Sequence, residues 1–472
     1  PDLQVDIDKW VKWVGDEAKV RLAEFFPSQD GETVVNYLWA HTVVCPSCES
    51  VVPLSPNWWL YKRPEKQNLS KWCAVRPVPN LKEKRVDFEL VRGKKGKGDT
   101  IVCENGEEYD PSDTVTMNRG VAKCPTCASL LENEIILQAG QSQKMNHEVY
   151  AVAYRKSGDK LDFRIPTQTD YEVIEKVEKI IGSSAFTEKP EYPIEEVPPV
   201  TRDTRLRLYG TSQWNQVFNP RQLLTLVTYA EIINEAKLKL QQEHEPEKVE
   251  AIVTYLTLVL DLCVDKNSRL SHWQAGRIGA KRASTSHALN LFWCYPETTG
   301  SGELWSSCAD DFASDYGSLC ELFGSLSQSS SIPNFEATGL VSTQICSASA
   351  DNLTHIADRS LHAVVTDPPY YATIQYSELS DFFYVWQKRV LGDIFPELYW
   401  SDLTDKDREA VANPSRFRNM GISPEELANQ DYEAKMALAF AEYHRVLRDD
   451  GVMTVQFNHK DSGAWDTLAK SL

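Results

Sequence analysis

The chain has 472 residues, of which 42% are hydrophobic and 25% are charged. These proportions are typical of folded globular proteins and exclude a disordered, collagen-like or fibrous chain. At roughly 150 residues per domain the length predicts two to four domains, and the net charge of −18 excludes a protein that coats nucleic acid with its whole surface.

The N-terminal third begins with a predicted amphipathic helix over residues 7–26. Apolar side chains recur there at helical spacing, and Pro27 ends the helix. A strand over 34–44 is expected next, followed by short strands broken by Gly, Pro and Asp over 45–130. This third ends with a predicted hairpin and helix: strands 149–154 and 161–165 around Ser157-Gly158-Asp159, then a helix over 171–181.

Four of the eleven cysteines form two Cys-x-x-Cys pairs: Cys45/Cys48 and Cys124/Cys127. Two such pairs supply four thiolates to a tetrahedral structural zinc, and this is the site that we predict. The alternatives are two unrelated pairs or redox pairs, although the strand, Cys-x-x-Cys and helix order of thioredoxin-like proteins is missing. His41 and Cys103 are substitute ligands. The odd number of cysteines, without a secretion signal, argues against a disulfide framework.

The segment between the two cysteine pairs is strongly basic. Between Lys62 and Lys97 there are twelve Lys or Arg and four Asp or Glu, a local charge of +8. Basic side chains attract phosphates and indoles stack on bases, so we predict that this segment binds DNA. The predicted contact residues are Trp58, Trp59, Lys62, Arg63, Lys94, Lys95 and Lys97. The alternative is a solvated loop whose tryptophans fill the core of the ribbon.

A polar, acidic linker that contains several prolines is predicted over residues 183–205. The chain then becomes helical, and one helix starts at Asn219-Pro220, an N-cap followed by proline in the first turn. A second helix, over 247–265, contains an apolar run that is shorter than the roughly 20 residues of a membrane-spanning helix. This run therefore predicts a buried helix.

From residue 341 onward the pattern alternates between strand and helix. Residues 361–366 and 452–457 predict two short buried strands, with Asp449-Asp450-Gly451 as the turn before the second. Strand, helix and strand in this order are the unit of a parallel α/β sheet. The helix between the strands presents one face at helical spacing: Tyr432, Met436, Phe440, Tyr443 and Leu447.

The motif Asp367-Pro368-Pro369-Tyr370 follows directly after the 361–366 strand. In open α/β sheets, ligands bind beyond the carboxyl ends of the strands. An acidic oxygen and a proline carbonyl can accept both hydrogens of an exocyclic amine, and a tyrosine ring can stack on the base, a contact of about 1–3 kcal/mol. The motif therefore predicts a catalytic loop for a flipped-out nucleobase with an amino group. A surface turn is the alternative, since Asp-Pro is a common turn pair.

The sequence TDPPYY at 366–371 resembles motif IV of the amino-methyltransferases that use S-adenosylmethionine. Its continuation, IQYSELSDFFYVW at 374–386, resembles the adenine-specific DNA methylases that contain a zinc ribbon, as do FNPRQL at 218–223 and the cysteine pairs. This resemblance implies methylation of adenine in DNA, as part of restriction-modification or phage defence. It implies that Asp367 and Pro368 hold the amine, that Tyr370 stacks on the base, and that Asp367 also borders the S-adenosylmethionine.

The fold expected from this resemblance is an α/β protein with a partial Rossmann-like methyltransferase sheet, an inserted zinc-ribbon β domain and a helical region. The expected segments follow in chain order. They are an N-terminal helical segment (1–40), the ribbon with its basic insert (41–182), the linker (183–205), the helical region (206–340) and the methyltransferase segment that carries the motif (341–472).

The glycine-rich cofactor loop of that family has no clear counterpart in this sequence, since Gly96-Lys97-Gly98 lies in the basic segment. Because the chain also starts at Pro1, we expect a fragment, with a missing N-terminal segment or a partner chain that supplies the cofactor loop. No signal peptide opens the chain, so we expect a cytoplasmic protein. The alternatives are a cytosine or RNA amino-methyltransferase, or a catalytically inert zinc-ribbon subunit that binds DNA.

Overall fold

The structure is a computed structural model that describes residues 2–29, 31–62, 72–156, 160–199, 205–328, 344–418, 420–421 and 423–472. The chain divides into two compact units. Unit 1 comprises 1–199, 204–313 and 382–403, and unit 2 comprises 200–203, 314–381 and 404–472. The chain passes between the units at several points, and two of these lie within helices: 313/314 in α7, Glu303–Gln328, and 381/382 in α8, Tyr376–Leu391. The five-segment division made from the sequence stays a prediction.

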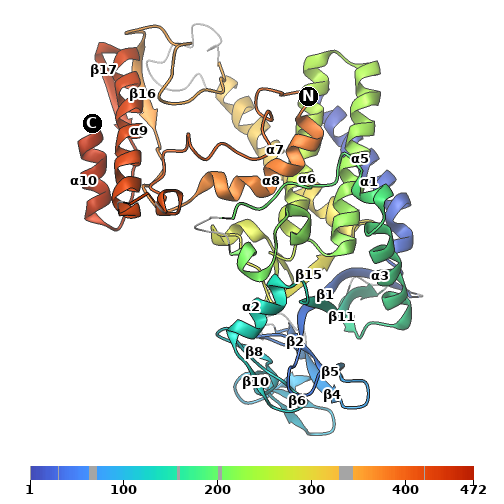
Figure 1. The fold of residues 1–472 in the computed structure, drawn as a ribbon. Helices are drawn as coiled ribbons and strands as arrows, with labels where there is room; N and C mark the ends of the chain where they lie inside the picture. Colours follow the sequence, from blue (N-terminus) through green and yellow to red (C-terminus); the bar gives the residue numbers. More distant parts are fainter. Residues whose placement is uncertain are drawn as a thin grey trace. The chain divides into compact units, whose positions relative to one another are not determined.

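Unit 1 is built around an antiparallel sheet whose central strand is β1, Glu32–Val44 (Figure 1). β1 pairs with β11 and β15, β11 pairs with β12, and β2 pairs with the end of β1. Residues 34–43 of β1 are all buried, which confirms the predicted strand. The predicted hairpin is also confirmed, although its turn, 157–159, lies outside the described residues. The strand bounds are β2 Val51–Leu54, β11 Asn146–Lys156, β12 Lys160–Arg164 and β15 Cys294–Thr298.

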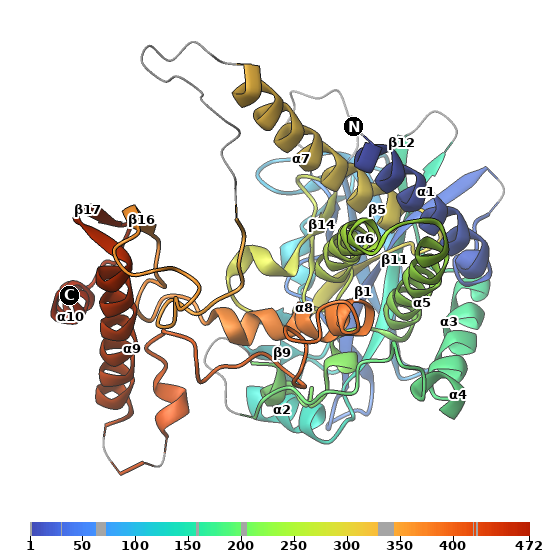
Figure 2. The same ribbon diagram turned by 90° about the horizontal axis from the view of Figure 1, so that it is seen from above.

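Helices α5 and α6 lie side by side, and α1 and α3 pack against α5 (Figure 2). Their bounds, with that of α7, are α1 Asp2–Leu22, α3 Gln168–Ile181, α5 Pro220–Glu243, α6 Pro246–Lys266 and α7 Glu303–Gln328. The first four confirm predicted helices. At the start of α5 the Asn219 side chain accepts a hydrogen bond from the N–H of Gln222, and Pro220 occupies a position where no N–H is needed. None of the helices in the described ranges is long and apolar enough to cross a membrane.

The shorter elements of unit 1 connect these helices and strands. They are η1 Ala23–Phe25, α2 Asn133–Gln141, α4 Ser184–Thr187, η4 Leu206–Tyr209, η5 Trp214–Val217, η6 Ala283–Ser286 and the hairpin of β13 His272–Gln274 with β14 Gly279–Lys281.

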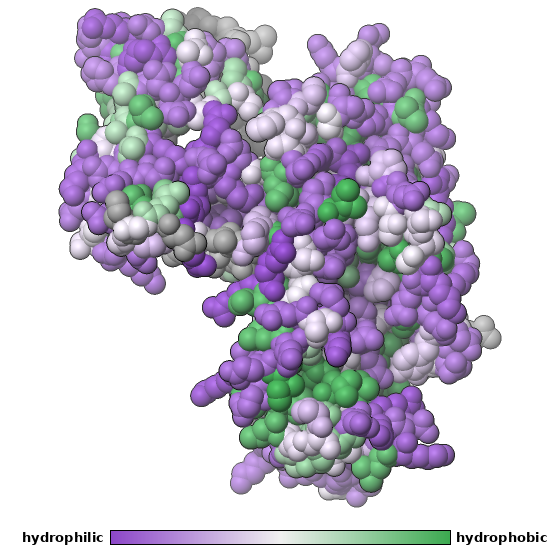
Figure 3. Space-filling view, in the orientation of Figure 1, coloured by the Kyte–Doolittle hydropathy of each residue, from purple (hydrophilic) through white to green (hydrophobic). Residues whose placement is uncertain are grey.

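The segment between the cysteine pairs, together with the short strand after the second pair, forms two small antiparallel sheets. One contains β3 Trp59–Tyr61, β4 Trp72–Asn80, β5 Arg85–Lys95, β6 Ile101–Cys103 and β7 Glu108–Tyr109. The other contains β8 Met117–Asn118, β9 Val121–Lys123 and β10 Leu130–Leu131, after the 3-10 turn η3 Pro111–Thr114. The face seen in Figure 3 is mostly hydrophilic, and apolar surface gathers over the part where Figure 1 labels α2 and β8.

A buried carboxylate joins the sheet of unit 1 to helix α5. Glu297 on β15 is fully buried, and its Oε2 accepts hydrogen bonds from Trp39 Nε1 at 2.6 Å, Asn219 Nδ2 at 3.1 Å and Arg221 Nη2 at 3.1 Å. Arg221 is 2% exposed, and its guanidinium lies 3.8 Å from the ring centroid of Tyr37. A buried ion pair is tolerated only when further hydrogen bonds satisfy its polar atoms, and here they do.

Unit 2 contains a parallel pair of strands, β16 Leu361–Thr366 and β17 Leu447–Val455, with helix α9 Pro424–Val446 between them in the chain. This order confirms the predicted strand–helix–strand unit, whereas the larger Rossmann-like methyltransferase sheet stays a prediction. The other elements are η7 Pro414–Phe417 and α10 Ser462–Ser471. The apolar core of unit 2 consists of Ala412, Ala428, Tyr432, Met436, Phe440 and Leu468.

The expectation that both strands of this pair are buried is wrong. Val365 is 71% exposed and Val452 is 63% exposed. Met453 and Val455 of β17 pack against the core formed with α9, while the residues that alternate with them face away. An apolar run predicts burial on both faces of a parallel sheet, but in the described part of unit 2 only one face is covered.

The predicted turn at Asp449-Asp450-Gly451 is also wrong, because these residues belong to β17. Leu361 is paired with Leu447 and Ala363 with Val452, so the residues between Leu447 and Val452 form an irregularity within the strand. A bulge accommodates extra residues without ending the strand. This explains why a sequence typical of a turn lies inside β17.

Breaking the buried pair in unit 1 should be far more destabilising than breaking an exposed pair. Arg221→Met leaves Glu297 buried without its main donor, and we expect the free energy of unfolding to fall by about 3–5 kcal/mol. The control is Arg282→Gln, which breaks an exposed pair with Asp311 and should cost less than about 1 kcal/mol. Urea unfolding followed by tryptophan fluorescence measures both, and equal destabilisation by the two variants would contradict the role of Glu297.

Candidate functional site

The four predicted zinc ligands come together in the structure. The sulfur atoms of Cys45, Cys48, Cys124 and Cys127 all lie within 4.8 Å of one another. The Sγ atoms of Cys45 and Cys127 are 3.7 Å apart, and those of Cys48 and Cys124 are 3.6 Å apart. A tetrahedral zinc with Zn–S bonds of about 2.3 Å separates its sulfurs by about 3.8 Å, and a disulfide needs about 2.05 Å. The cluster could therefore bind a metal ion such as zinc.

Each cysteine pair lies in a hairpin, and the two hairpins have the same backbone geometry. In the first, between β1 and β2, the N–H of Cys45 donates to the carbonyl of Ser50 at 2.9 Å, and Glu49 has a φ of 62°. In the second, between β9 and β10, the N–H of Cys124 donates to the carbonyl of Ser129 at 2.9 Å, and Ala128 has a φ of 61°. Two distant segments thus repeat one metal-binding turn.

The surroundings of the sulfurs favour the thiolate form of Cys48 and Cys127 and the neutral thiol form of the buried Cys124. A hydrogen bond with Ser129 lowers the pKa of Cys127 to about 6, and a hydrogen bond with Ser50 lowers the pKa of Cys48. Burial raises the pKa of Cys124 to about 12. A bound cation would reverse that last shift, because a coordinating thiol is deprotonated. The substitute ligands His41 and Cys103 are not part of the cluster, so the predicted set of four cysteines stands.

The tryptophans of the basic segment divide between core and surface. Trp58 is fully buried, and its indole N–H donates to the carbonyl of Thr114 at 2.9 Å. It has no free face for a base, and we reassign it from the DNA-binding surface to the core. Trp59 is half-buried. Its ring centroid lies 5.2 Å from that of Trp72 and 5.3 Å from Lys62 Nζ. Arg63 lies outside the described residues.

The predicted lysines of this segment are on the surface, but their neighbours are acidic. Lys94 and Lys95, at the end of β5, and Lys97 are exposed and form no ion pair with any described residue. β5 pairs with β6 and β6 with β7, which brings acidic residues to the same sheet: Asp99, Glu104, Glu107 and Glu108. Lys62 and Arg76 are paired with Asp99 and Glu107 respectively. The surface is therefore mixed in charge, which the count along the sequence does not show.

The predicted catalytic loop begins where β16 ends. Asp367 is exposed, and the interaction of its carboxylate with the hydroxyl of Tyr370 raises the pKa of Tyr370. The ring of Tyr370 meets the ring of Phe457 edge-on, with centroids 5.8 Å apart. The loop thus places a carboxylate and an aromatic ring together at the carboxyl end of a parallel strand, where ligands bind in α/β sheets.

The two proline carbonyls of the loop differ in their hydrogen bonding. The carbonyl of Pro369 accepts hydrogen bonds from the N–H of Tyr371 at 2.8 Å and from the hydroxyl of Tyr432 at 3.0 Å. The carbonyl of Pro368 accepts none from the described residues. Pro368 therefore keeps a free acceptor next to the carboxylate of Asp367.

Tyr371 is held in a strained backbone conformation. Its φ of 56° lies in the left-handed region, which costs a bulky residue on the order of 1–3 kcal/mol. The residue is fixed on several sides: its hydroxyl donates to Asn429 Oδ1, its carbonyl accepts from the N–H of Ala412 at 3.1 Å, and its ring lies edge-on to Tyr432 and His459. Strain that the surrounding structure maintains in this way is concentrated at functional sites.

The segment after the motif supports the loop through its polar residues. The Ser377 N–H donates to Glu409 Oε1 at 3.0 Å, Glu378 Oε1 accepts from Asn413 Nδ2 at 2.9 Å, and Asp381 Oδ1 accepts from the Thr404 N–H at 3.0 Å. Residues 377–381 thus hold segment 404–413, which includes the Ala412 bonded to the strained tyrosine. This arrangement gives a physical reason for the polar pattern of this segment.

Gln375 is a site residue that the sequence analysis missed. It is fully buried, and neither the oxygen nor the nitrogen of its side-chain amide has a hydrogen-bond partner among the described residues. A buried polar group without a partner costs on the order of 1–3 kcal/mol, so Gln375 is a candidate ligand contact. A periodic pattern could not identify it, because the signal is the lack of a partner in three dimensions. The spacing of Tyr432 and Met436 on one helix face, in contrast, was visible in the sequence.

A cavity of about 420 Å³ opens beside the loop, within unit 2. It is lined by Tyr371, Ala372, Ala412, Pro414, Ser415, Arg418, Pro424, Glu425 and Asn429. The strained tyrosine and its partner Asn429 are therefore wall residues of a space that is large enough for a small ligand group.

Comparison with protein-family models, with curated proteins and with solved structures finds no match to this chain. The resemblance to DNA methylases therefore rests on the sequence motifs alone.

Replacing one buried cysteine of the cluster should abolish metal binding. Cys124→Ser removes a thiolate, and because structural zinc contributes folding free energy directly, the region between Val43 and Leu130 should unfold locally. The control is Cys103→Ser, at a half-buried cysteine outside the cluster. Elemental analysis of zinc per chain and limited proteolysis give the result. Absence of metal from the unaltered protein, purified without chelator, would contradict the assignment.

Proposed function

We propose that this chain acts as a DNA amino-methyltransferase, which transfers a methyl group from S-adenosylmethionine to the exocyclic amine of adenine. The observation that supports this most is the pair of neighbouring hydrogen-bond acceptors after β16. Asp367 is exposed and the Pro368 carbonyl accepts no hydrogen bond from the described residues. Two neighbouring acceptors match the two N–H groups of an aromatic amine. A simple surface turn would not require the strained Tyr371 beside them.

The role of the loop in this reaction is to position the amine. Asp367 and the Pro368 carbonyl would accept its two hydrogens, fix its plane and increase the lone-pair character of its nitrogen. Correct orientation alone can contribute several kcal/mol to a displacement reaction. The Tyr370 hydroxyl, whose pKa the carboxylate of Asp367 raises, would turn away from that carboxylate as the amine arrives. The ring of Tyr370 would then stack on the flipped-out base.

S-adenosylmethionine, when bound, supplies an electrophilic methyl group. Asp367, at the end of β16, and the unsatisfied amide of Gln375 are polar groups that fit a ligand of this kind. The exposed apolar face of the strand pair, with Val365 and Val452, supports a further part of the proposal. Helices from another segment of the protein or from a partner chain would cover this face, because helices normally cover both faces of a parallel sheet, and the same segment would carry the cofactor loop.

The cysteine cluster favours a second candidate function. A zinc ribbon with exposed lysines outside any ion pair among the described residues can bind DNA without any catalysis, as an inert subunit would. Binding of S-adenosylmethionine, measured by calorimetry, separates the two functions. The target base is a separate question, because the amine of cytosine also presents two N–H groups to the loop. Analysis of methylated nucleosides in DNA and RNA distinguishes adenine, cytosine and RNA targets.

Removing the carboxylate of the loop should abolish methyl transfer without unfolding the protein. Loss of an orienting acceptor typically lowers the rate about a hundredfold or more, and the exposed Asp367 supports no core. The measurement is incorporation of labelled methyl groups into DNA by full-length Asp367→Ala. Asp449→Ala, an exposed carboxylate on β17, is the control and should keep full activity. Turnover at the unaltered rate by Asp367→Ala would show that the loop is structural.

The exposed lysines of β5 and the loop after it should contribute to DNA affinity by binding phosphates. Removing one lysine–phosphate interaction lowers the slope of log affinity against log salt by about 0.9 on duplex DNA, so Lys94→Gln, Lys95→Gln and Lys97→Gln together should lower it by up to about 2.7. A charge-matched control replaces the exposed Lys9, Lys12 and Lys179. Binding isotherms at several salt concentrations measure the slope, and an identical slope in both triple variants would remove these lysines from the interface.

A further inference from the structure

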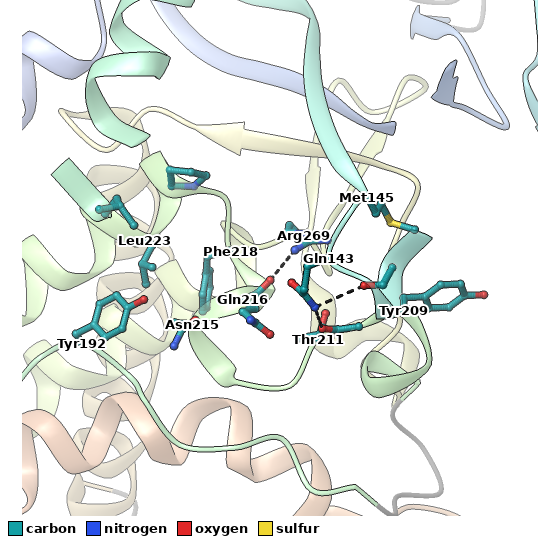
Figure 4. A pocket seen from close by; sticks show the side chains of 14 residues that line it. Gln143, Met145, Tyr192, Tyr209, Thr211, Asn215, Gln216, Phe218, Leu223 and Arg269 are labelled. Atoms are coloured by element: carbon teal, nitrogen blue, oxygen red, sulfur yellow. Dashed lines mark hydrogen bonds between the residues drawn. The ribbon is translucent and has the colours of Figure 1, made fainter. Parts of the chain in front are cut away.

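Unit 1 contains a pocket with a guanidinium group that no described carboxylate neutralises. The pocket has a volume of about 230 Å³, and Arg269 is the only charged residue in its described lining. Figure 4 shows Arg269 beside Gln143 and Gln216, with a hydrogen bond from its guanidinium to Gln216. No described residue forms an ion pair with it, and its shielded Nε has no hydrogen-bond partner among them.

The groups that surround Arg269 do not compensate its positive charge. Its Nη1 donates to the carbonyl of Gln216 at 2.7 Å, and its Nη2 lies 3.5 Å from Nδ1 of His41. Burial lowers the pKa of His41 and lowers the pKa of His147 to about 3. The positive charge of Arg269 lowers both pKa values further. Both imidazoles are therefore neutral at neutral pH, and the guanidinium carries the only charge of this group of three residues.

The wall of the pocket is rigid and preformed. Gln143 Nε2 donates to the carbonyl of Gly210 at 2.6 Å. Gly210 has a φ of 83°, and a Cβ added to it would lie 1.9 Å from the carbonyl oxygen of Gly140. A Cβ added to Gly140 would lie 2.5 Å from the carbonyl oxygen of Tyr209. Two backbone segments thus touch directly, and glycine is required at both positions. A preformed pocket loses little conformational entropy on binding.

We propose that this pocket binds a small organic anion, a carboxylate or a phosphate ester, through Arg269. The flat, rigid fork of the guanidinium matches both oxyanions, and an isolated charge withdrawn from water is costly until an opposite charge pairs with it. The aromatic residues Tyr192, Tyr209 and Phe218 also line the pocket and would contact the flat part of the ligand. This site lies within unit 1 and does not depend on the proposed methyl transfer.

Isothermal calorimetry on the full-length, metal-loaded protein tests this at constant ionic strength. The probes are benzoate, phenyl phosphate and the neutral analogue benzyl alcohol. Arg269→Gln should weaken binding of at least one anion tenfold or more, and Arg282→Gln, whose partner is the exposed Asp311, should not. Benzoate and phenyl phosphate together distinguish a carboxylate site from a phosphate site. Binding of neither anion, equal binding by Arg269→Gln, or equal binding of benzyl alcohol would overturn the proposal.

A second measurement keeps the test independent of how Arg269→Gln folds. The chain has nine histidines, so carbon-13 labelling of histidine gives a resolvable NMR spectrum of the unaltered protein. An anion that pairs with Arg269 should shift the resonances of His41 and His147, because it cancels the neighbouring positive charge. Saturating benzyl alcohol should leave them in place. Resonances that do not respond to a bound anion would place that anion elsewhere and overturn the proposal.

Discussion

Unit 1 depends on one buried carboxylate. Glu297 is fully buried on β15 and accepts hydrogen bonds from Arg221 and Asn219 at the start of α5 and from Trp39 on β1. A charge at this depth is stable only if every lone pair is used, so the three elements must keep their mutual positions. β1 then continues directly into the hairpin of Cys45, so this ordered core also positions the cysteine cluster.

The same network explains the sequence FNPRQL at 218–223. Asn219 caps the helix and also bonds to Glu297, and Arg221 forms the buried pair. Gln222 donates to the carbonyl of Pro296 at 3.2 Å, on the same strand as the carboxylate. Each polar residue therefore has a structural task. The polar residues of this segment form a framework for unit 1, and nothing in their contacts requires a ligand.

Local signals in the sequence predicted much of this fold. The helical periods of α3, α5 and α6, the cap at Asn219-Pro220 and the turns of the two cysteine pairs are all fixed by residues a few positions apart. The strand before the Asp367-Pro368-Pro369-Tyr370 motif was also predicted from a short local run of apolar residues. Such features need no knowledge of the rest of the chain, and the four cysteines could be paired because each turn forms by itself.

What the sequence could not supply depends on distant parts of the chain. Trp58 and Trp59 are neighbours, and only the sheet decides that one is core and the other is partly on the surface. The exposure of Val365 depends on how many layers cover the strands. Gln375 and Arg269 were identified because polar atoms of their side chains have no hydrogen-bond partner among the described residues. Sequence periodicity cannot reveal a missing partner.

We propose that the loop after β16 presents a nucleobase amine for methylation. The decisive measurement is mass spectrometry of nucleosides from DNA and RNA incubated with the full-length protein and S-adenosylmethionine. We expect a new methyl group on the exocyclic nitrogen of adenine in DNA. A methyl group on a ring carbon, or no methylated base in either nucleic acid although the protein binds S-adenosylmethionine, would contradict it.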